Sequence, residues 1–154
     1  MASQTPRSPP SDSSALVLLV SIGGQAFALP TRAIEQLLPM AAVTPVPEGQ
    51  PGVAGVLNLH GEPLAVVDPR PRMGFATRLP ALDQHLVVVA EPSRYILWVD
   101  GIDGVTEVGE MIDQEDGSDA GIVSQLIARE GQLIPVLSLE ALAPQPTAYM
   151  APTP

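Results

Sequence analysis

The side chains of this chain that could most readily do chemistry are acidic. Asp68 ends an apolar run, Asp100 and Asp103 follow another, and a pair of aspartates can share acid–base work. The Asp-Thr-Gly or Asp-Ser-Gly turn of aspartic proteases is missing, however, and Asp100-Gly101 and Asp103-Gly104 also have the composition of turns. A small acidic β-barrel hydrolase is therefore the enzymatic hypothesis, and a set of turn residues is its alternative.

Other catalytic groups are scarce. The chain has no cysteine, and its two histidines, His60 and His85, stand far apart in the sequence. It contains no Gly-x-Ser-x-Gly elbow, no His-Glu-x-x-His helix and no lysine for a phosphate loop. The acidic run 113–119 fails the calcium-loop spacing, because Gly117 falls at the fifth position instead of the sixth. The sequence predicts no catalytic residue, no metal site and no cofactor.

Composition and charge disfavour some classes of partner without indicating a particular one. The 154 residues carry a formal net charge of −10, and all basic residues are arginine. Such an acidic chain does not suit nucleic acid or an anionic membrane surface. The chain lacks an apolar run of the roughly 20 residues that a membrane helix needs, and Met1–Ser14 has no apolar segment typical of a secretory signal. We expect a cytoplasmic protein with an aliphatic core.

Short apolar runs between turn residues predict an all-β fold with short helices. A helix is expected to begin at Pro30-Thr31, because Ile34, Leu37 and Leu38 follow at helical spacing, and a second is expected at 139–142. Residues 111–121 are expected to form an acidic loop. The predicted strands are 15–21, 25–29, 55–59, 64–67, 86–90, 95–99, 104–108, 122–128 and 133–139.

The strand pattern repeats after 70 positions. At this offset residues 16–20 align with 86–90, Gly61 aligns with Gly131, and 64–67 align with 134–137. One supersecondary unit used twice explains the match, although aliphatic strands can also coincide by chance. We predict two intertwined, SH3-like barrels of four or five strands each over residues 15–143. A disordered arm over 1–14 and a Pro-rich tail over 144–154 would flank them.

Several segments together resemble CheW-like domains. Gly55–Asp68, with the sequence GVLNLHGEPLAVVD, resembles the family's strand Gly-Val-x-Asn-Leu-Arg-Gly, its turn and its returning strand that ends in Asp. Val99–Ile102 is similar to the family's Val-Asp-x-Val. Phe27–Pro30 with the following helix, and Gly131–Leu139, resemble its early strand and its last hairpin. The resemblance covers residues 16–142 and implies two SH3-like five-stranded β-barrel subdomains with short helices.

The resemblance also implies a function. CheW-like adaptors perform no reaction; they couple chemoreceptors to the histidine kinase CheA, binding the regulatory domain of the kinase and the cytoplasmic hairpin tip of the receptor. They work in the cytoplasm at membrane-associated receptor arrays. Carried over by position, the residues expected to bind the receptor or the kinase, or to support those surfaces, are Ile34, Leu37, Gly55, Asn58, His60, Gly61 and Val99.

Two positions depart from the family pattern. His60 replaces the arginine of Asn-Leu-Arg-Gly, and histidine lacks the permanent charge and fixed donor fork of a guanidinium. Gln36 stands where the early segment usually carries an acid, with Glu35 beside it. Both changes fall on the expected partner surface. The alternative hypothesis is therefore a diverged adaptor of another signalling system, such as a type IV pilus chemosensory system, with a different partner.

Overall fold

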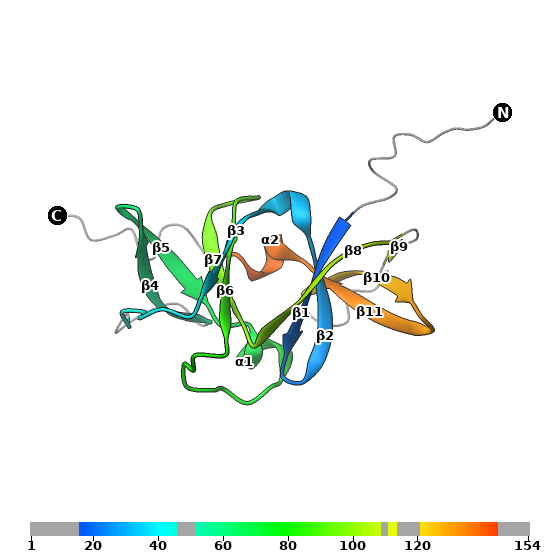
Figure 1. Ribbon diagram of the computed structural model, residues 1–154, viewed down its shortest axis with the longest axis horizontal. Coiled ribbons are helices and arrows are strands. Elements are labelled where there is room, and N and C mark those ends of the chain that lie inside the picture. Colours follow the sequence, from blue (N-terminus) through cyan, green and yellow to red (C-terminus); the bar gives the residue numbers. More distant parts are fainter. Residues whose placement is uncertain (1–15, 46–51, 109–110, 114–120, 145–154) are drawn as a thin grey trace.

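The structure is a computed structural model of the chain and describes residues 16–45, 52–108, 111–113 and 121–144. Most of these residues lie in strands that form two sheets (Figure 1). Three short helical segments accompany them: a 3₁₀ turn at Thr31–Ala33, α1 at Arg70–Met73 and α2 at Leu139–Leu142. The predicted all-β class is confirmed, and α2 lies where the sequence places it.

The two sheets lie side by side (Figure 1). The first has the order β8 (Gly101–Glu107), β1 (Leu16–Ile22), β2 (Gln25–Pro30), β11 (Gln132–Leu137), β10 (Val123–Arg129) and β9 (Met111–Asp113). The second has the order β3 (Ile34–Pro39), β6 (His85–Val89), β7 (Tyr95–Val99), β5 (Glu62–Val67) and β4 (Val53–Leu59).

The two halves of the sequence exchange hairpins. The hairpin β1–β2 from the first half joins β8, β10 and β11 from the second half, whereas β6–β7 joins β3, β4 and β5. The exchanged hairpins are attached through parallel pairs, with Val136 opposite Ala28 in one sheet and Val66 opposite Ile96 in the other. Consequently, each sheet needs both halves of the chain.

Equivalent elements in the two halves agree in detail. An offset of 70 residues superimposes the bounds of β4 on those of β10, and those of β5 on those of β11. A shift in pairing between Val53 and Gly55 has its counterpart between Val123 and Gln125. The residues that open the two hairpin turns, His60 and Glu130, both have φ of +53°. One structural pattern is thus used twice.

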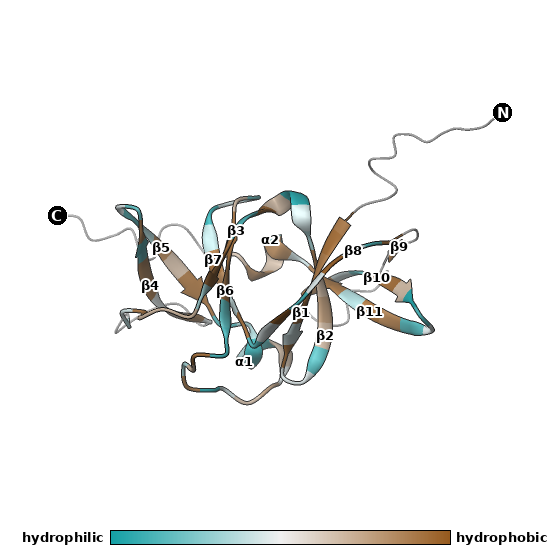
Figure 2. Cartoon of the chain, in the orientation of Figure 1, coloured by the Kyte–Doolittle hydropathy of each residue, from teal (hydrophilic) through white to brown (hydrophobic). Residues whose placement is uncertain are grey.

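Apolar residues on both faces of the central strands make three packed clusters. Val17 and Leu19 of β1 belong to a cluster in the first sheet, whereas Leu18 belongs to the largest cluster, which joins the two sheets. Likewise Val87 of β6 faces the shared cluster and Val88 faces a cluster in the second sheet. Burial on both faces explains why these strands have unbroken aliphatic sequences. Figure 2 shows the same contrast, with hydrophobic strands and hydrophilic hairpin tips.

The predicted helix after Pro30 is wrong beyond its first turn. Only Thr31–Ala33 is helical, and Ile34–Pro39 forms β3, an antiparallel neighbour of β6. A pairing shift between Ile34 and Gln36 changes the phase of the strand, so Ile34 packs against the shared cluster and Leu38 against the cluster of the second sheet. Leu37, which completed the helical spacing, is 42% exposed, so the three apolar residues do not share one buried face. Pairing with β6 also satisfies backbone groups that would otherwise lie at a bare sheet edge.

Two predicted loops also differ from the structure. Met111–Asp113 forms β9, which gives the first sheet six strands instead of five. The predicted turn Asp103-Gly104 lies within β8, where Leu19 and Val20 of β1 pair with Gly104 and Ile102 and leave Asp103 as an extra residue. Gly104 has φ of +128°, so the Asp-Gly sequence marks a β-bulge.

Some predictions lie outside the described residues. These are the arm over 1–14, the tail after Pro144 and the part of the acidic run over 114–119. Within the described ranges, no helix combines the length and hydropathy required to cross a membrane.

At Gly55 in β4, the segment that contains Val43 and Thr44 approaches the backbone closely. Thr44 and Val56 exchange backbone hydrogen bonds of 2.8 and 2.9 Å in an isolated bridge. A Cβ at Gly55 would lie 2.3 Å from the Thr44 carbonyl oxygen and 2.7 Å from a Val43 methyl carbon. The glycine is therefore required by close backbone approach, which makes it a structural residue.

We expect Gly55→Ala to lower the free energy of unfolding by about 1–3 kcal/mol, because backbone atoms must shift to admit the methyl group. Urea unfolding followed by circular dichroism measures the loss. Gly101→Ala is the matched control, since its Cβ would meet only the Ser21 hydroxyl oxygen, at the end of a rotatable side chain. An equal loss in both variants would contradict the role of the Thr44 contact.

Candidate functional site

The seven predicted binding residues divide by exposure. Gly55 and Val99 are buried, Ile34 is half-buried, and the other four are exposed: Leu37, Asn58, His60 and Gly61. Val99, with no exposed surface, can act on a partner only through the packing of β7. Direct contact is open to Leu37 on β3 and to the β4–β5 turn.

The β4–β5 turn has a fixed geometry that explains its sequence. His60 and Gly61 have φ of +53° and +88°, the left-handed values of a type I′ hairpin turn. The Asn58 side-chain oxygen accepts a hydrogen bond of 2.8 Å from the Gly61 N–H. Asn58 and Gly61 thus shape the turn, and position 60 is left exposed to solvent.

Arg94 connects this turn to β3. Its guanidinium donates to both carboxylate oxygens of Glu35, at 2.7 and 3.0 Å, and it also pairs with Glu62. Hydrogen bonds from Arg94 hold the pKa of Glu35 below its ordinary value, and His60 lies close enough to act in the same direction. We call the surface made by Glu35, His60, Glu62 and Arg94, together with the exposed Leu37 two positions further along β3, the Arg94 face.

The ion pairs of the Arg94 face contribute little to stability, because half-exposed pairs are well solvated. Their effect is to fix charges in position. Arg94, which comes from the β6–β7 turn, places a guanidinium beside a position where His60 supplies none. Sequence reasoning missed Arg94 and Glu62, since the two contacts of Arg94 span 59 and 32 residues and no local pattern marks them.

A groove of about 800 Å³ opens where the two sheets meet. It lies at the start of β1 and the end of β2, beside the 3₁₀ turn, the β6–β7 turn and the start of α2. None of the seven predicted residues lines it. Its apolar lining includes Leu16, Pro30, Ala33, Met111, Val136 and Leu137, and its charged residues are Arg32, Glu91 and Glu140. A lining that combines apolar and charged residues suits an amphipathic helix.

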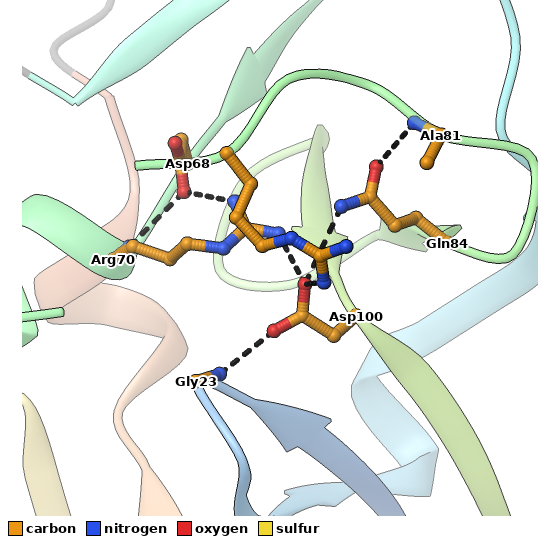
Figure 3. Close-up of polar contacts among 7 residues, drawn as sticks. Gly23, Asp68, Arg70, Ala81, Gln84 and Asp100 are labelled. Carbon is orange, nitrogen blue, oxygen red and sulfur yellow. Dashed lines mark hydrogen bonds and ion pairs between the residues drawn. The ribbon is translucent and has the colours of Figure 1, made fainter. Parts of the chain in front are cut away.

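A buried charge cluster lies at the opposite end of the β1–β2 hairpin (Figure 3). The Arg70 side chain is fully buried and contacts Asp68 and Asp100, each at 2.7 Å. Its guanidinium carbon lies 4.6 Å from the centre of the Trp98 ring. Asp100 also accepts a hydrogen bond of 2.7 Å from the Gly23 N–H in the β1–β2 turn. The cluster thereby ties both sheets together.

The comparisons with known proteins now decide the family. The family model described as "CheW-like domain" matches residues 16–146. The chain belongs to the CheW-like domain family. It is 28% identical over 130 residues to the chemotaxis protein CheW of Rhizobium meliloti (strain 1021), covering 80% of this chain and 83% of that protein. The crystal structure of scaffolding protein TtCheW from Thermoanaerobacter tengcongensis has a TM-score of 0.75 at 19% identity, covering 82% of this chain and 90% of that one.

Two acids of the CheW-like signature have a structural role here. Asp68, which ends the β5 segment, and Asp100, which follows β7, converge on Arg70 although 32 residues separate them in the sequence. Burial raises the pKa of Asp100, but hydrogen bonds from Arg70 and the Gly23 N–H outweigh it and bring the pKa below its ordinary value. Asp100 is therefore ionised at neutral pH and paired.

This arrangement counts against the hydrolase hypothesis. Asp68 and Asp100 share one guanidinium, and a general acid at Asp100 would have to hold a proton that its ion pair with Arg70 disfavours. Asp103 is exposed on β8. Within the described residues, histidine and acidic side chains form no group of three or more that could hold a metal ion.

We expect Arg70→Met to lower the free energy of unfolding by about 3–5 kcal/mol, because it leaves two carboxylates without their buried partner. Urea unfolding followed by Trp98 fluorescence measures the loss, since the guanidinium lies against that ring.

Arg78→Met is the control for this prediction. Arg78 reaches the same Asp100 oxygen at 3.0 Å from a side chain that is 46% exposed. Its removal should cost about 0–1 kcal/mol. Similar losses in the two variants would show that burial does not set the strength of this cluster.

Proposed function

We propose that this protein is a chemosensory adaptor that holds a chemoreceptor and the histidine kinase CheA together and catalyses no reaction itself. Membership of the CheW-like family supports the proposal, as does the name of the Rhizobium meliloti relative. The observation that carries it is the groove between the sheets, because a coupling protein needs a concave site of this kind. Such an adaptor would act in the cytoplasm, recruited to membrane-associated receptor arrays.

The groove is the surface we assign to the receptor tip. A helical hairpin presents an apolar stripe flanked by polar residues, which matches a lining of Leu16, Ala33 and Val136 with Arg32 and Glu140 beside it. This assignment differs from the sequence-based expectation, which placed receptor contacts at residues such as Leu37 and Asn58.

The Arg94 face is the surface we assign to the regulatory domain of the kinase. It combines one exposed apolar side chain, Leu37, with charges that Arg94 holds in place, and these features suit a specific contact of modest size. The face and the groove share no residue, although Pro92 of the groove and Arg94 of the face lie in the same β6–β7 turn. Simultaneous binding of both partners, which coupling requires, is part of the proposal.

Calorimetric titration against a purified CheA regulatory domain, and separately against a receptor tip fragment, tests the proposal. We expect saturable binding in the micromolar range, about −8 kcal/mol, for each partner. If neither partner binds, the proposed function is wrong. The partner of a diverged adaptor would then be sought by pull-down.

We expect Leu16→Arg to weaken binding to the receptor fragment about 10-fold or more, because it puts a charge on the apolar floor of the groove. Leu133→Arg is the matched control. Both leucines are exposed on the first sheet, but Leu133 does not line the groove. Equal affinities for the two variants would remove the groove from the proposal. Kinase binding should be unchanged in both.

We expect His60→Arg to strengthen binding to the kinase regulatory domain, since it restores the family residue on the Arg94 face beside Glu35. Glu130→Arg is the control, because Glu130 occupies the equivalent turn position with the same φ of +53° on the other hairpin. Unchanged or weaker binding by His60→Arg would favour the second candidate function, a diverged adaptor whose partner differs. The observation behind that candidate is the replacement of the family arginine.

A further inference from the structure

The helix α2 forms one wall of the groove. Its N-cap Ser138 and its first two residues, Leu139 and Glu140, all line the site. A helix of four residues is too short to keep its position through its own hydrogen bonds. The shape of the groove therefore depends on contacts that fix α2 from other parts of the chain. Figure 1 shows α2 between the two sheets, where either sheet can supply such contacts.

Tyr95 of β7 supplies the first of these contacts. Its side chain is fully buried, and its hydroxyl donates a hydrogen bond of 2.7 Å to the Leu139 carbonyl, 44 residues away in the sequence. Both residues belong to the apolar cluster that joins the two sheets. Burial raises the pKa of the Tyr95 hydroxyl, which therefore keeps its proton and stays a donor. The second sheet thus fixes the start of α2.

Arg72 of α1 supplies a second contact, near the end of α2. Its guanidinium donates a hydrogen bond of 2.7 Å to the Ala141 carbonyl. Within α2, the Ala141 N–H donates to the Ser138 side-chain hydroxyl at 3.1 Å, so the N-cap closes the first turn. Side chains from β7 and α1 therefore hold two carbonyl oxygens of α2, those of Leu139 and Ala141.

The equivalent helix of the first half, α1, is anchored differently. At the offset of 70 residues Glu140 aligns with Arg70, and Tyr95 aligns with Gln25. Arg70 is fully buried in its ion cluster, whereas Glu140 and Gln25 are both exposed. The buried charge that anchors α1 therefore has no counterpart at position 140, and a buried hydroxyl at position 95 fixes α2 instead. This difference between the halves makes Tyr95 an anchor peculiar to the groove.

We propose that Tyr95 is a positioning residue for the groove, because its hydrogen bond to the Leu139 carbonyl fixes the wall that the receptor tip packs against. The inference rests on the proposed function, which assigns the groove to the receptor. Tyr95 does not line the groove and acts through Leu139. A wall that is ordered in advance loses less conformational entropy when a ligand binds. The Arg94 face is held by its own ion pairs with Glu35 and Glu62 and does not depend on this contact.

Calorimetric titration of the Tyr95→Phe chain tests the proposal, with the receptor tip fragment and the kinase regulatory domain as separate ligands. Phenylalanine keeps the buried ring and removes only the donor. We expect receptor affinity to fall about 5-fold, the equivalent of one hydrogen bond, and kinase affinity to stay at the wild-type value.

Two further variants accompany this titration. Arg72→Met should also weaken receptor binding, because it removes the second contact of α2, and it decides the role of this wall if Tyr95→Phe does not fold. Arg78→Met is the matched control and should leave both affinities unchanged, since Arg78 pairs with Asp100, outside the groove. Circular dichroism checks the fold of each variant.

Amide hydrogen exchange gives a second measurement, which needs no receptor. The Leu142 N–H donates to the Ser138 carbonyl in α2 at 3.1 Å, and the Met73 N–H donates to the Pro69 carbonyl in α1 at 3.2 Å. In Tyr95→Phe the Leu142 amide should exchange about 5-fold faster than in wild type, and the Met73 amide should be unchanged. The two amides occupy equivalent places in the two halves, so a general loss of stability would accelerate both.

The outcomes separate the inference from the proposed function. Wild-type receptor affinity in Tyr95→Phe would overturn the inference, and so would equal losses for both partners, which indicate a general structural role. If the wild-type chain binds no receptor fragment, the proposed function is wrong, and hydrogen exchange alone then decides the inference. Faster exchange confined to Leu142 would support the positioning role, and an unchanged or general exchange rate would overturn it.

Discussion

The fully buried guanidinium of Arg70 is the interaction on which the arrangement of the two sheets depends. A buried cation is tolerated only where opposite charges and hydrogen-bond acceptors surround it. Asp68, which follows β5, and Asp100, which follows β7, both form ion pairs with Arg70. Asp100 then binds the N–H of Gly23 in the β1–β2 turn, which belongs to the other sheet. One ion cluster therefore fixes the register between parts of the fold that the sequence separates widely.

The exchange of hairpins gives the rest of the molecule its rigidity. Because β1–β2 and β6–β7 are each buried on both faces, the shared cluster continues from one sheet to the other without a polar boundary. The groove is a consequence of this arrangement: it opens where the exchanged hairpin β1–β2 meets β11 and α2. A site that lies across such a junction keeps its shape only while both sheets keep their positions.

Local signals made much of this fold predictable from sequence. Strands such as Tyr95–Val99 are continuous apolar runs. The β4–β5 turn is marked by Asn58 and Gly61, which lie three positions apart and are joined by a hydrogen bond from the Gly61 N–H to the Asn58 side chain. The candidate site was harder to predict from the sequence, because its contacts join residues that are far apart in the chain. Nothing near Arg94 in the sequence indicates Glu35, and the groove is lined from six separate segments. The helix prediction assumed that Ile34, Leu37 and Leu38 share one buried face, whereas in β3 Leu37 is exposed and the other two pack against different clusters.

The distribution of roles also explains which family features this chain keeps and which it changes. Asp68 and Asp100 of the CheW-like signature are committed to Arg70, and Gly55 to the close approach of Thr44. Altering any of them would disturb the fold itself. His60 is different, because the turn is shaped by Asn58 and Gly61 and imposes only a left-handed backbone on position 60. Its side chain is free to change the Arg94 face without cost to the barrels. Divergence of partner specificity at constant fold is therefore expected to begin at such turn positions.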